Sequence, residues 1–390
     1  MLEPEKMTID NSNKKILIMA GGTGGHVFPA LSIAEYLKSS GVQVEWLGTR
    51  KGLEASVISE TDIPLHFISV AGLRGTSLFK KLLSPFVILL AVIQAMRKVI
   101  QIKPGCVLGM GGFVTGPGGL AAWLLRKKLL IHEQNAIAGL TNQLLFPLAS
   151  TVMEAFPGAF ERKREITGNR LLKSFIRPGN TVVVGNPVRK EIADLGAARL
   201  DQPGDAERAL RVLVIGGSLG AVAINKTIPA MLALMSEEAR PDLIHQCGNR
   251  NLEETREFYR QHQLATNGSI QVLPFIKDMA ESYCWADIII ARAGAMTVSE
   301  MAAVGLASIL IPFPYAVDDH QTENAGYLER AGAADVIQQD ALDAQKLKLL
   351  IEKYSNNRSL LQQASNNARK AGSPNATEKA ASLCMEACYA

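Results

Sequence analysis

The chain has 390 residues, of which 47% are hydrophobic and 20% are charged, so it is long enough for two globular domains of ordinary size. Its 41 basic and 37 acidic residues leave a net charge of +4, which is too mild to indicate a nucleic-acid-binding protein. The polar start, residues 1–15, has no apolar stretch of a secretory signal, and this predicts a cytoplasmic protein. The five cysteines are scattered rather than spaced as a zinc site, so we expect buried, reduced thiols.

The first half of the chain opens with a short apolar run that leads into a glycine-rich turn. Residues 15–20 (KILIMA) predict a strand, and the turn at 21–26 (GGTGGH) precedes a helix expected over about 29–39. Such a turn presents free backbone N–H groups and the positive end of a helix dipole to an anion. The glycine spacing differs from the dinucleotide fingerprint, and the next predicted strand, 44–48, does not end in the ribose-binding acid. An NAD-dependent oxidoreductase is therefore a poor fit.

A denser glycine cluster follows at residues 109–119 (GMGGFVTGPGG). Glycines there could serve only a tight strand-to-helix connection with close packing. We favour a second anion-binding turn, because close packing alone is expected to need fewer glycines.

The apolar segment 73–93 lies between these two turns and contains Lys80 and Lys81. Its most apolar part, residues 82–93, is too short to span a bilayer. An exposed apolar surface beside cations suits a membrane that carries anionic lipids. We therefore expect residues 73–86 to be partly exposed at a membrane surface and the chain from Val87 onward to be mostly core.

The second half repeats the pattern 195 residues later, where a run at 211–215 (RVLVI) precedes the turn 216–220 (GGSLG). Further strands are expected at 242–246, 270–273, 287–291 and 307–312. The alternation of strands and helices predicts two α/β domains with parallel sheets, and a cleft between them suits a diphosphate ligand. We place the boundary near Arg189, which gives domains 1–188 and 189–372, with a polar connector at 192–209. The final helix, 373–390, is a candidate to pack back on the first domain.

The segment 292–300 (RAGAMTVSE) follows one of these strands. Small residues and Thr297 at a helix start leave backbone N–H groups open to a phosphate. Glu300, about one turn further on, can accept hydrogen bonds from vicinal ribose hydroxyls. The alternative is an ordinary first-turn acid that the helix dipole favours.

Seven motifs follow one another in a family order over almost the whole chain: GGTGGHVFPALSIAEYL, GMGGFVTGPGG, HEQNAIAG, AFPGAF, VVVGNPVR, GGSLGAVAIN and RAGAMTVSE. On these motifs the chain resembles the MurG family of glycosyltransferases. The resemblance implies the GT-B fold, an α/β architecture of two Rossmann-like domains whose parallel sheets face each other across a deep cleft. It also implies a donor-binding C-terminal domain and an acceptor-binding, membrane-side N-terminal domain.

The resemblance further implies a reaction, its substrates and its location. N-acetylglucosamine would pass from UDP-N-acetylglucosamine to the muramyl 4-hydroxyl of lipid I, which makes lipid II for peptidoglycan, with inversion and without a metal or cofactor. The chain fits the metal-free part, since none of its 13 aspartates stands two residues from another, so it has no D-x-D motif. The enzyme would attach peripherally to the cytoplasmic face of the inner membrane, with other cell-wall synthesis proteins as candidate partners and no nucleic acid.

Donor contacts are implied residue by residue at Thr23, Gly24, Gly25, Asn135, Arg189, Ser218, Ile276, Ala295, Met296, Thr297, Val298, Ser299, Glu300 and Gln321. The turns expected to hold the acceptor diphosphate contain Gly21, Gly22, Gly111, Gly112 and Thr115. The family pattern is less closely followed by the donor run 318–324 (DDHQTEN) and by the long segment 161–180.

His26 is the candidate general base, because an imidazole can take a proton from the attacking hydroxyl near neutral pH. Its alternative role is to cap or orient the first turn. Glu133 is a second candidate base, whereas the amide of Asn135 can orient a hydroxyl but cannot deprotonate it. His132 and His320 are expected to be structural or orienting.

Three other functions remain open at this point. Another GT-B glycolipid synthase would differ in its acceptor. A UDP-N-acetylglucosamine epimerase would turn over the donor with no acceptor present. A nucleotide-sensing module would bind UDP without any transfer.

Overall fold

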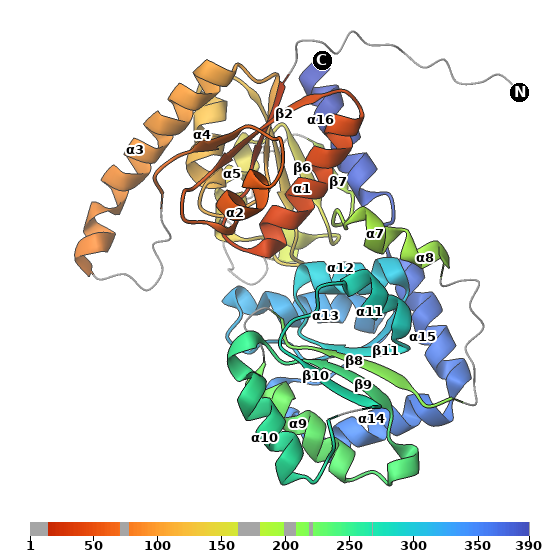
Figure 1. Cartoon of the computed structure of the whole chain (residues 1–390). Coiled ribbons are helices and arrows are strands. Elements are labelled where there is room, and N and C mark those ends of the chain that lie inside the picture. Colours follow the sequence, from red (N-terminus) through yellow and green to blue (C-terminus); the bar gives the residue numbers. More distant parts are fainter. Residues whose placement is uncertain are drawn as a thin grey trace, which may run out of the picture. The chain divides into compact units, whose positions relative to one another are not determined.

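The computed structural model describes residues 15–70, 78–162, 180–198, 208–217, 221–266 and 268–389. The chain divides into two compact units (Figure 1). Unit 1 consists of Met1–Gln134, Ala138–Pro187 and Asn375–Ala390, and unit 2 consists of Asn135–Ile137 and Val188–Pro374. Each unit is an α/β domain built on one parallel sheet, which confirms the predicted fold class.

Within the described part of unit 1, seven parallel strands form a sheet in the order β3-β2-β1-β4-β5-β6-β7. The strands are β1 (Lys15–Met19), β2 (Gln43–Gly48), β3 (Leu65–Phe67), β4 (Cys106–Gly109), β5 (Lys128–Glu133), β6 (Thr151–Glu154) and β7 (Asn180–Val183). The helices are α1 (Gly24–Ser39), α2 (Leu53–Ser59), α3 (Leu78–Ile102), α4 (Thr115–Leu124), α5 (Leu140–Leu145), the 3₁₀ helix η1 (Phe146–Leu148) and α16 (Ala376–Tyr389).

The centre of the unit 1 sheet is buried on both faces. Ile16 and Ile18 of β1 join one apolar cluster together with α1 and α16, while Leu17 and Met19 join a second cluster with α3 and α4. Successive strand residues point to opposite faces, so an unbroken apolar run is what a doubly covered parallel strand requires.

The C-terminal helix α16 belongs to unit 1, where it packs against α1 and β4. Its Cys384 and Cys388 lie in the core, and burial raises the pKa of the Cys384 thiol to about 12, so this thiol stays protonated. None of the five cysteines forms a disulfide, but Cys284 is only half-buried, so the expectation of buried thiols is wrong at that position.

The described part of unit 2 contains a second parallel sheet, of six strands in the order β10-β9-β8-β11-β12-β13. The strands are β8 (Arg211–Ile215), β9 (Asp242–Gln246), β10 (Ile270–Leu273), β11 (Ile288–Ala291), β12 (Ala307–Leu310) and β13 (Ala334–Val336). The helices are α7 (Lys190–Ala193), α8 (Leu195–Ala198), α9 (Val222–Ala233), α10 (Leu252–Gln261), α11 (Met279–Trp285), α12 (Ala295–Val304), α13 (His320–Arg330), α14 (Ala344–Asn356) and α15 (Arg358–Ala371). Short 3₁₀ turns are η4 (Glu237–Ala239), η5 (Asn249–Asn251), η6 (Val317–Asp319) and η7 (Gln339–Ala341).

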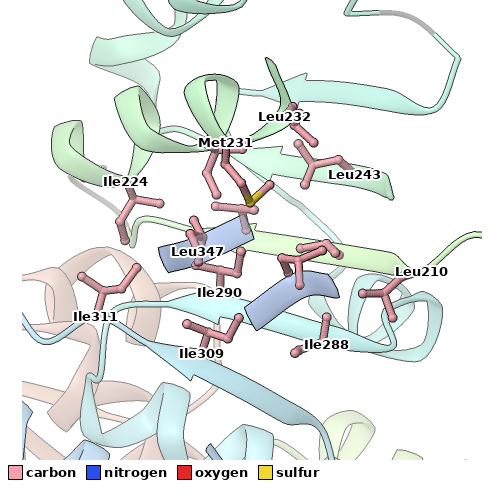
Figure 2. Close-up of a cluster of buried hydrophobic side chains, with 14 of the residues drawn as sticks. Leu210, Ile224, Met231, Leu232, Leu243, Ile288, Ile290, Ile309, Ile311 and Leu347 are labelled. Atoms are coloured by element: carbon pink, nitrogen blue, oxygen red, sulfur yellow. The ribbon is translucent and has the colours of Figure 1, made fainter. Parts of the chain in front are cut away.

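One face of this sheet carries the main core of unit 2. Figure 2 shows Ile288 and Ile290 of β11 and Ile309 of β12 in the same cluster as Met231 of α9 and Leu347 of α14. These side chains are fully buried or nearly so, and each such burial contributes about 1.5–3 kcal/mol to folding. The core therefore holds β8 and β11 rigidly beneath the turns that follow them.

Several predicted boundaries differ from the structure. Helix α1 begins at Gly24 rather than at about Pro29, so the glycine turn supplies the first turn of the helix. Two short helices, α7 and α8, occupy the start of the expected connector 192–209. Ile192 of α7 is fully buried, so this part of the chain is packed rather than a polar linker.

The apolar helix α3 corrects a further expectation. Residues 85–90, which include Phe86, Leu89 and Leu90, are exposed, and Ala91 is the first buried residue after them. The prediction of core from Val87 onward is therefore wrong by about one helical turn. Residues 73–77 lie outside the described residues. By length and composition the window Pro85–Ile102 could also cross a membrane, although a single helix of this kind does not distinguish a span from a core helix.

Candidate active site

The first glycine turn and the dense glycine cluster of unit 1 lie side by side. Strands β1 and β4, which precede them, are paired in register, and the strand order reverses between these two strands. Open α/β sheets bind ligands at such a switch point, beyond the carboxyl ends of the strands. A Cβ atom on Gly112 would lie only 2.1 Å from the carbonyl oxygen of Gly21. The structure thus brings the two predicted diphosphate turns together.

Close packing explains much of the dense cluster. An added Cβ would fall between 2.1 and 2.9 Å from another atom at five positions: Gly109, Gly111, Gly112, Gly118 and Gly119. Our argument that packing alone needs fewer glycines is therefore wrong. Gly111 and Gly112 also have φ values of +92° and +81°, a region that favours glycine.

Thr115 is a buried side chain that holds the dense glycine turn against the end of β1. Its fully buried hydroxyl lies 2.6 Å from the Gly111 carbonyl oxygen and 3.0 Å from that of Met19. The side chain therefore fixes the turn rather than pointing outward, and a direct diphosphate contact from Thr115 stays a prediction for its backbone N–H.

Glu54 is a residue of this site that the sequence analysis missed. Its fully buried carboxylate accepts hydrogen bonds from the Gly22 N–H at 3.1 Å, the Thr49 N–H at 2.7 Å and the Thr49 hydroxyl at 2.8 Å. Added Cβ atoms on Gly21 and Gly52 would collide with the same carboxylate. Glu54 thus holds the first glycine turn against the end of β2. An isolated glutamate in a short helix carries no motif, so nothing in the sequence pointed to it.

His26, in the first turn of α1, is half-buried and lies over the glycine cluster. Its Nδ1 lies 3.0 Å from Gln134 Oε1, and a Cβ on Gly111 would lie 2.9 Å from the imidazole ring. Gln134 Nε2 in turn lies 3.2 Å from Nδ1 of His132, and His132 Nε2 lies 2.9 Å from the Gly185 carbonyl oxygen. Burial lowers the pKa of His132 to about 4, so this histidine is neutral near pH 7.

Glu133, the second candidate base, is buried and holds a loop. Its Oε2 accepts hydrogen bonds from the Gly139 N–H at 3.0 Å and from Asn142 Nδ2 at 2.9 Å. These bonds suit a carboxylate that orders the segment after β5.

In unit 2 the predicted phosphate sites also stand at a switch point. The turn Gly216–Gly217 follows β8, Gly294 caps the N-terminus of α12 after β11, and β8 and β11 are paired. Among the described residues no side chain caps α12, and the N–H groups of residues 295–297 lie outside the helix ladder. Met296 and Thr297 are half-buried, whereas Ala295 and Val298 are buried and can offer only backbone atoms. Ser218 lies outside the described residues.

Glu300 and Arg189, both predicted donor contacts, pair with each other. Glu300 Oε1 lies 3.4 Å from Arg189 Nη2, and Glu300 Oε2 accepts a 2.8 Å hydrogen bond from the buried Tyr283 hydroxyl. Burial raises the pKa of Glu300, while Arg189 and Tyr283 oppose the shift. Arg189 therefore serves at least to hold the Glu300 carboxylate, a role the sequence analysis did not assign.

Asn135 belongs to unit 2, where it contacts Asn324, a second site residue that was not predicted from the sequence. Fully buried Asn324 donates to Asn135 Oδ1 at 3.3 Å and to the Ala293 carbonyl oxygen at 3.1 Å, and its Oδ1 accepts from the Ala136 N–H at 2.8 Å. This amide joins the segment 135–137 to the residue before the cap of α12.

Gln321 and Ile276 complete the predicted donor set. Gln321 Oε1 accepts a hydrogen bond from the Phe313 N–H at 2.9 Å, which aims the amide before any ligand is present. The preceding Asp318 and Asp319 have φ values of +55° and +53°, a costly conformation that is typical of functional loops. The Ile276 side chain is buried, so a contact with a base stays a prediction for its backbone.

Metal ligands do not gather in the described part of the chain, where no group of three or more His, Cys, Asp or Glu side chains could hold an ion.

Comparison with known proteins agrees with this geometry in both units. Residues 16–154 match the glycosyltransferase family 28 N-terminal domain, and residues 211–380 match the family 28 C-terminal domain. A relative from Marinobacter nauticus, named UDP-N-acetylglucosamine--N-acetylmuramyl-(pentapeptide) pyrophosphoryl-undecaprenol N-acetylglucosamine transferase, is 47% identical over 97% of this chain and 99% of its own length.

Among solved structures, some are similar to this chain in both sequence and fold, and others in fold alone. The crystal structure of Acinetobacter baumannii MurG has a TM-score of 0.79 and 40% identity, and the match covers 96% of this chain and 100% of that one. A UDP-GlcNAc 2-epimerase from Neisseria meningitidis, bound to UDP-GlcNAc, has a TM-score of 0.66 over 96% of this chain and 100% of that one, but at 13% identity it shares the fold alone. The chain therefore belongs to the MurG family, within glycosyltransferase family 28.

Proposed function

We propose that this protein transfers N-acetylglucosamine from UDP-N-acetylglucosamine to lipid I, undecaprenyl-pyrophosphoryl-N-acetylmuramyl-pentapeptide, and so makes lipid II for peptidoglycan. The observation that carries the proposal is that a relative named for this transfer matches both units almost from end to end. The two switch-point turns support it, because each unit offers backbone N–H groups suited to one phosphorylated substrate.

Unit 2 is the proposed donor unit, and its uncapped helix α12 is the proposed diphosphate site. The N–H groups of residues 295–297 and the helix dipole favour an anion, and the turn at Gly217 and Ser218 would supply further donors. The absence of a D-x-D motif in the sequence supports a transfer in which these groups, rather than a metal, stabilise the leaving diphosphate. Arg189 is a candidate for additional positive charge.

The nucleoside and sugar contacts are proposed from the polar groups around α12. Each Glu300 oxygen already accepts one hydrogen bond and keeps lone pairs for a ribose hydroxyl. Ile276 would meet the uracil edge through its backbone, and the oriented amide of Gln321 would meet sugar hydroxyls. The remaining predicted contacts are Thr23, Gly24, Gly25, Asn135, Val298 and Ser299.

Unit 1 is the proposed acceptor unit. The paired turns, Gly21–Gly22 and Gly111–Gly112, are the proposed site of the lipid pyrophosphate. The Gly22 N–H itself donates to Glu54, and Glu54 and Thr115 hold these turns in place. His26 stands at the rim of both turns and is the proposed general base.

In the proposed reaction, the muramyl 4-hydroxyl oxygen attacks C1 of N-acetylglucosamine while its proton passes to His26. The bond between C1 and the β-phosphate oxygen breaks, and UDP leaves with the electron pair. Because a single displacement attacks opposite the leaving group, the configuration at C1 inverts.

The first turns of α3 are the proposed membrane contact. Phe86, Leu89 and Leu90 are more than half exposed, and Figure 1 shows this end of α3 extending beyond α4. Lys80 and Lys81 belong to the same helix. Apolar residues beside cations favour peripheral attachment to anionic lipids. The proposed attachment is to the cytoplasmic face of the inner membrane.

The decisive experiment measures transfer of labelled N-acetylglucosamine to a short-chain lipid I analogue, with chelator present and an acceptor-free control. We expect chelator-resistant transfer and a product with inverted configuration. His26→Gln should lower kcat by about 10²–10⁴-fold, whereas His262→Gln, an exposed histidine of unit 2, should not change it. Donor turnover or epimer formation without acceptor, and no transfer with it, would refute the proposal in favour of an epimerase.

A further inference from the structure

We infer that Gln134 and His132 are positioning residues that hold the neutral His26 imidazole in the Nδ1–H tautomer, which leaves the lone pair on Nε2 as the proton acceptor. The assignment of that lone pair to the acceptor hydroxyl rests on the proposed function. The tautomer itself rests only on contacts within unit 1 and can be measured without any substrate.

The Gly185 carbonyl oxygen determines which atoms donate and which accept along this chain of hydrogen bonds. A carbonyl oxygen can only accept, and it lies 2.9 Å from His132 Nε2, so Nε2 must carry the hydrogen. His132 is fully buried and neutral near pH 7, so it carries a single ring hydrogen. Its Nδ1 is therefore a lone pair that requires a donor.

The orientation of the Gln134 amide then determines which ring nitrogen of His26 carries the hydrogen. Its amide nitrogen lies 3.2 Å from His132 Nδ1 and supplies the required N–H, which turns Oε1 toward His26. Oε1 lies 3.0 Å from His26 Nδ1 and can only accept, so Nδ1 must carry the hydrogen. The opposite amide orientation would set Oε1 against the His132 lone pair and leave both groups without a donor.

The chain of contacts is rigid at each link. Gln134 and His132 are almost completely buried, and the Gln134 carbonyl oxygen accepts a 3.0 Å hydrogen bond from Asn186 Nδ2. The glycine at position 111 lets the backbone approach the His26 ring, which limits its rotation. Among the described residues, His26 Nε2 has no hydrogen-bond partner, so the lone pair stays available to a ligand.

This arrangement serves a base in two ways. The imidazole presents its lone pair before the acceptor binds, so no tautomer exchange precedes the proton transfer. When Nε2 takes the proton, Nδ1–H keeps its bond to Oε1, whose partial negative charge faces the positive ring. Gln134 thus orients and stabilises the base without exchanging a proton, as the aspartate does in serine protease triads.

The test is nitrogen NMR of the full chain labelled with ¹⁵N-histidine, with the His26 signals assigned by their loss in His26→Gln. We expect a protonated-type shift for Nδ1 and a lone-pair shift for Nε2 in the wild type. Gln134→Leu removes the acceptor at similar volume, so His26 should move toward the Nε2–H form that a solvated imidazole prefers. Gln134→Glu keeps an acceptor oxygen for His26 Nδ1–H and should restore that form. Its second oxygen faces His132 Nδ1, so in this variant His132 should gain a proton there.

Kinetics provide the second readout. Gln134→Leu should lower kcat by about 10-fold or more, with KM for both substrates changed less than about threefold, because the loss concerns proton transfer rather than binding. Gln143→Leu, the same substitution at a half-buried glutamine of unit 1, should change neither kcat nor the His26 shifts.

An Nε2–H tautomer in the wild type overturns the inference, and so does a Gln134→Leu protein with wild-type shifts and kcat. If Gln134→Leu does not fold, the wild-type spectrum still decides the tautomer. If His26 is Nδ1–H but His26→Gln transfers sugar normally, the positioning inference stands and the proposed base fails.

Discussion

Replacing Glu54 by glutamine should loosen the first glycine turn of unit 1. The wild-type carboxylate accepts three hydrogen bonds, from the N–H groups of Gly22 and Thr49 and from the Thr49 hydroxyl, and it is fully buried. A glutamine side chain has the same size but carries one NH₂ group in place of an oxygen. Whichever way the amide is turned, this NH₂ faces a backbone N–H that can only donate.

The expected loss follows from these contacts. A hydrogen bond to a charged group contributes about 1.5–3 kcal/mol, and a buried donor left without an acceptor costs a similar amount. We therefore expect Glu54→Gln to lower the free energy of unfolding of unit 1 by about 2 kcal/mol or more. For a domain of roughly 150–250 residues, that corresponds to a fall of about 4–8 °C in Tm.

Differential scanning calorimetry of the full chain measures this loss, and transfer kinetics measure its effect on function. KM for the lipid I analogue should rise, because Gly22 belongs to the turns proposed to hold the acceptor pyrophosphate. The matched control is Glu60→Gln, the same change at an exposed glutamate just after α2, which should stay within about 0.5 kcal/mol of the wild type. Equal Tm values for the two variants would refute the reasoning.

Three further perturbations test other parts of the molecule. Gly112→Ala should destabilise unit 1 by more than Gly41→Ala in thermal unfolding, because both glycines have φ near +80° but only Gly112 would place its Cβ against another atom; equal losses would contradict the close approach. Burial raises the pKa of Glu300, although its two hydrogen-bond partners oppose the shift, so the folded carboxyl binds its proton more tightly than the unfolded one. The wild type should therefore lose stability relative to Glu300→Gln as pH rises from about 4.5, and a difference in Tm that is independent of pH would argue against this shift. Phe86→Ser should weaken binding to anionic vesicles in a flotation assay, whereas Leu349→Ser, at an exposed leucine of unit 2, should not; equal effects would exclude α3 as the contact.

Seven strands could be located from sequence because each contains a short apolar run, whereas the less buried strands β3, β7 and β13 were not located individually. The bounds of β8, β9 and β10 agree with the predicted ranges 211–215, 242–246 and 270–273. The start of α1 could not be predicted from sequence. Gly24 and Gly25 have poor helix propensity, and they are helical only in the context of the packed turn. Local patterns therefore located the strands better than the helix that follows the first glycine turn.

The supporting residues of the site could not be predicted, since their contacts join distant parts of the chain. Glu54 reaches Gly22 across 32 residues, and Asn324 reaches Asn135 across 189 residues. His132 is anchored by a carbonyl 53 residues away. His132 and Asn324 stand in motifs, HEQNAIAG and the run 318–324, but a motif does not show which distant atom each side chain contacts.

The exposed part of α3 also could not be predicted from its sequence. Residues 85–93 are all apolar, so composition does not show where within this run packing against α4 and the sheet begins. The buried residues Ala91, Ala95 and Val99 mark the packed stripe, and only the tertiary contacts of unit 1 define its start.

The position of α16 has a consequence for how the chain is made. Apart from the segment 135–137, unit 2 is continuous from Val188 to Pro374, whereas unit 1 needs a helix that leaves the ribosome only after all of unit 2. Until then, the face of α1 and β4 that buries Ala380 and Cys384 is exposed to solvent. Unit 2 can thus fold during synthesis, while unit 1 must wait with an open apolar face. The half-made chain is therefore the stage at which aggregation or chaperone binding should concentrate.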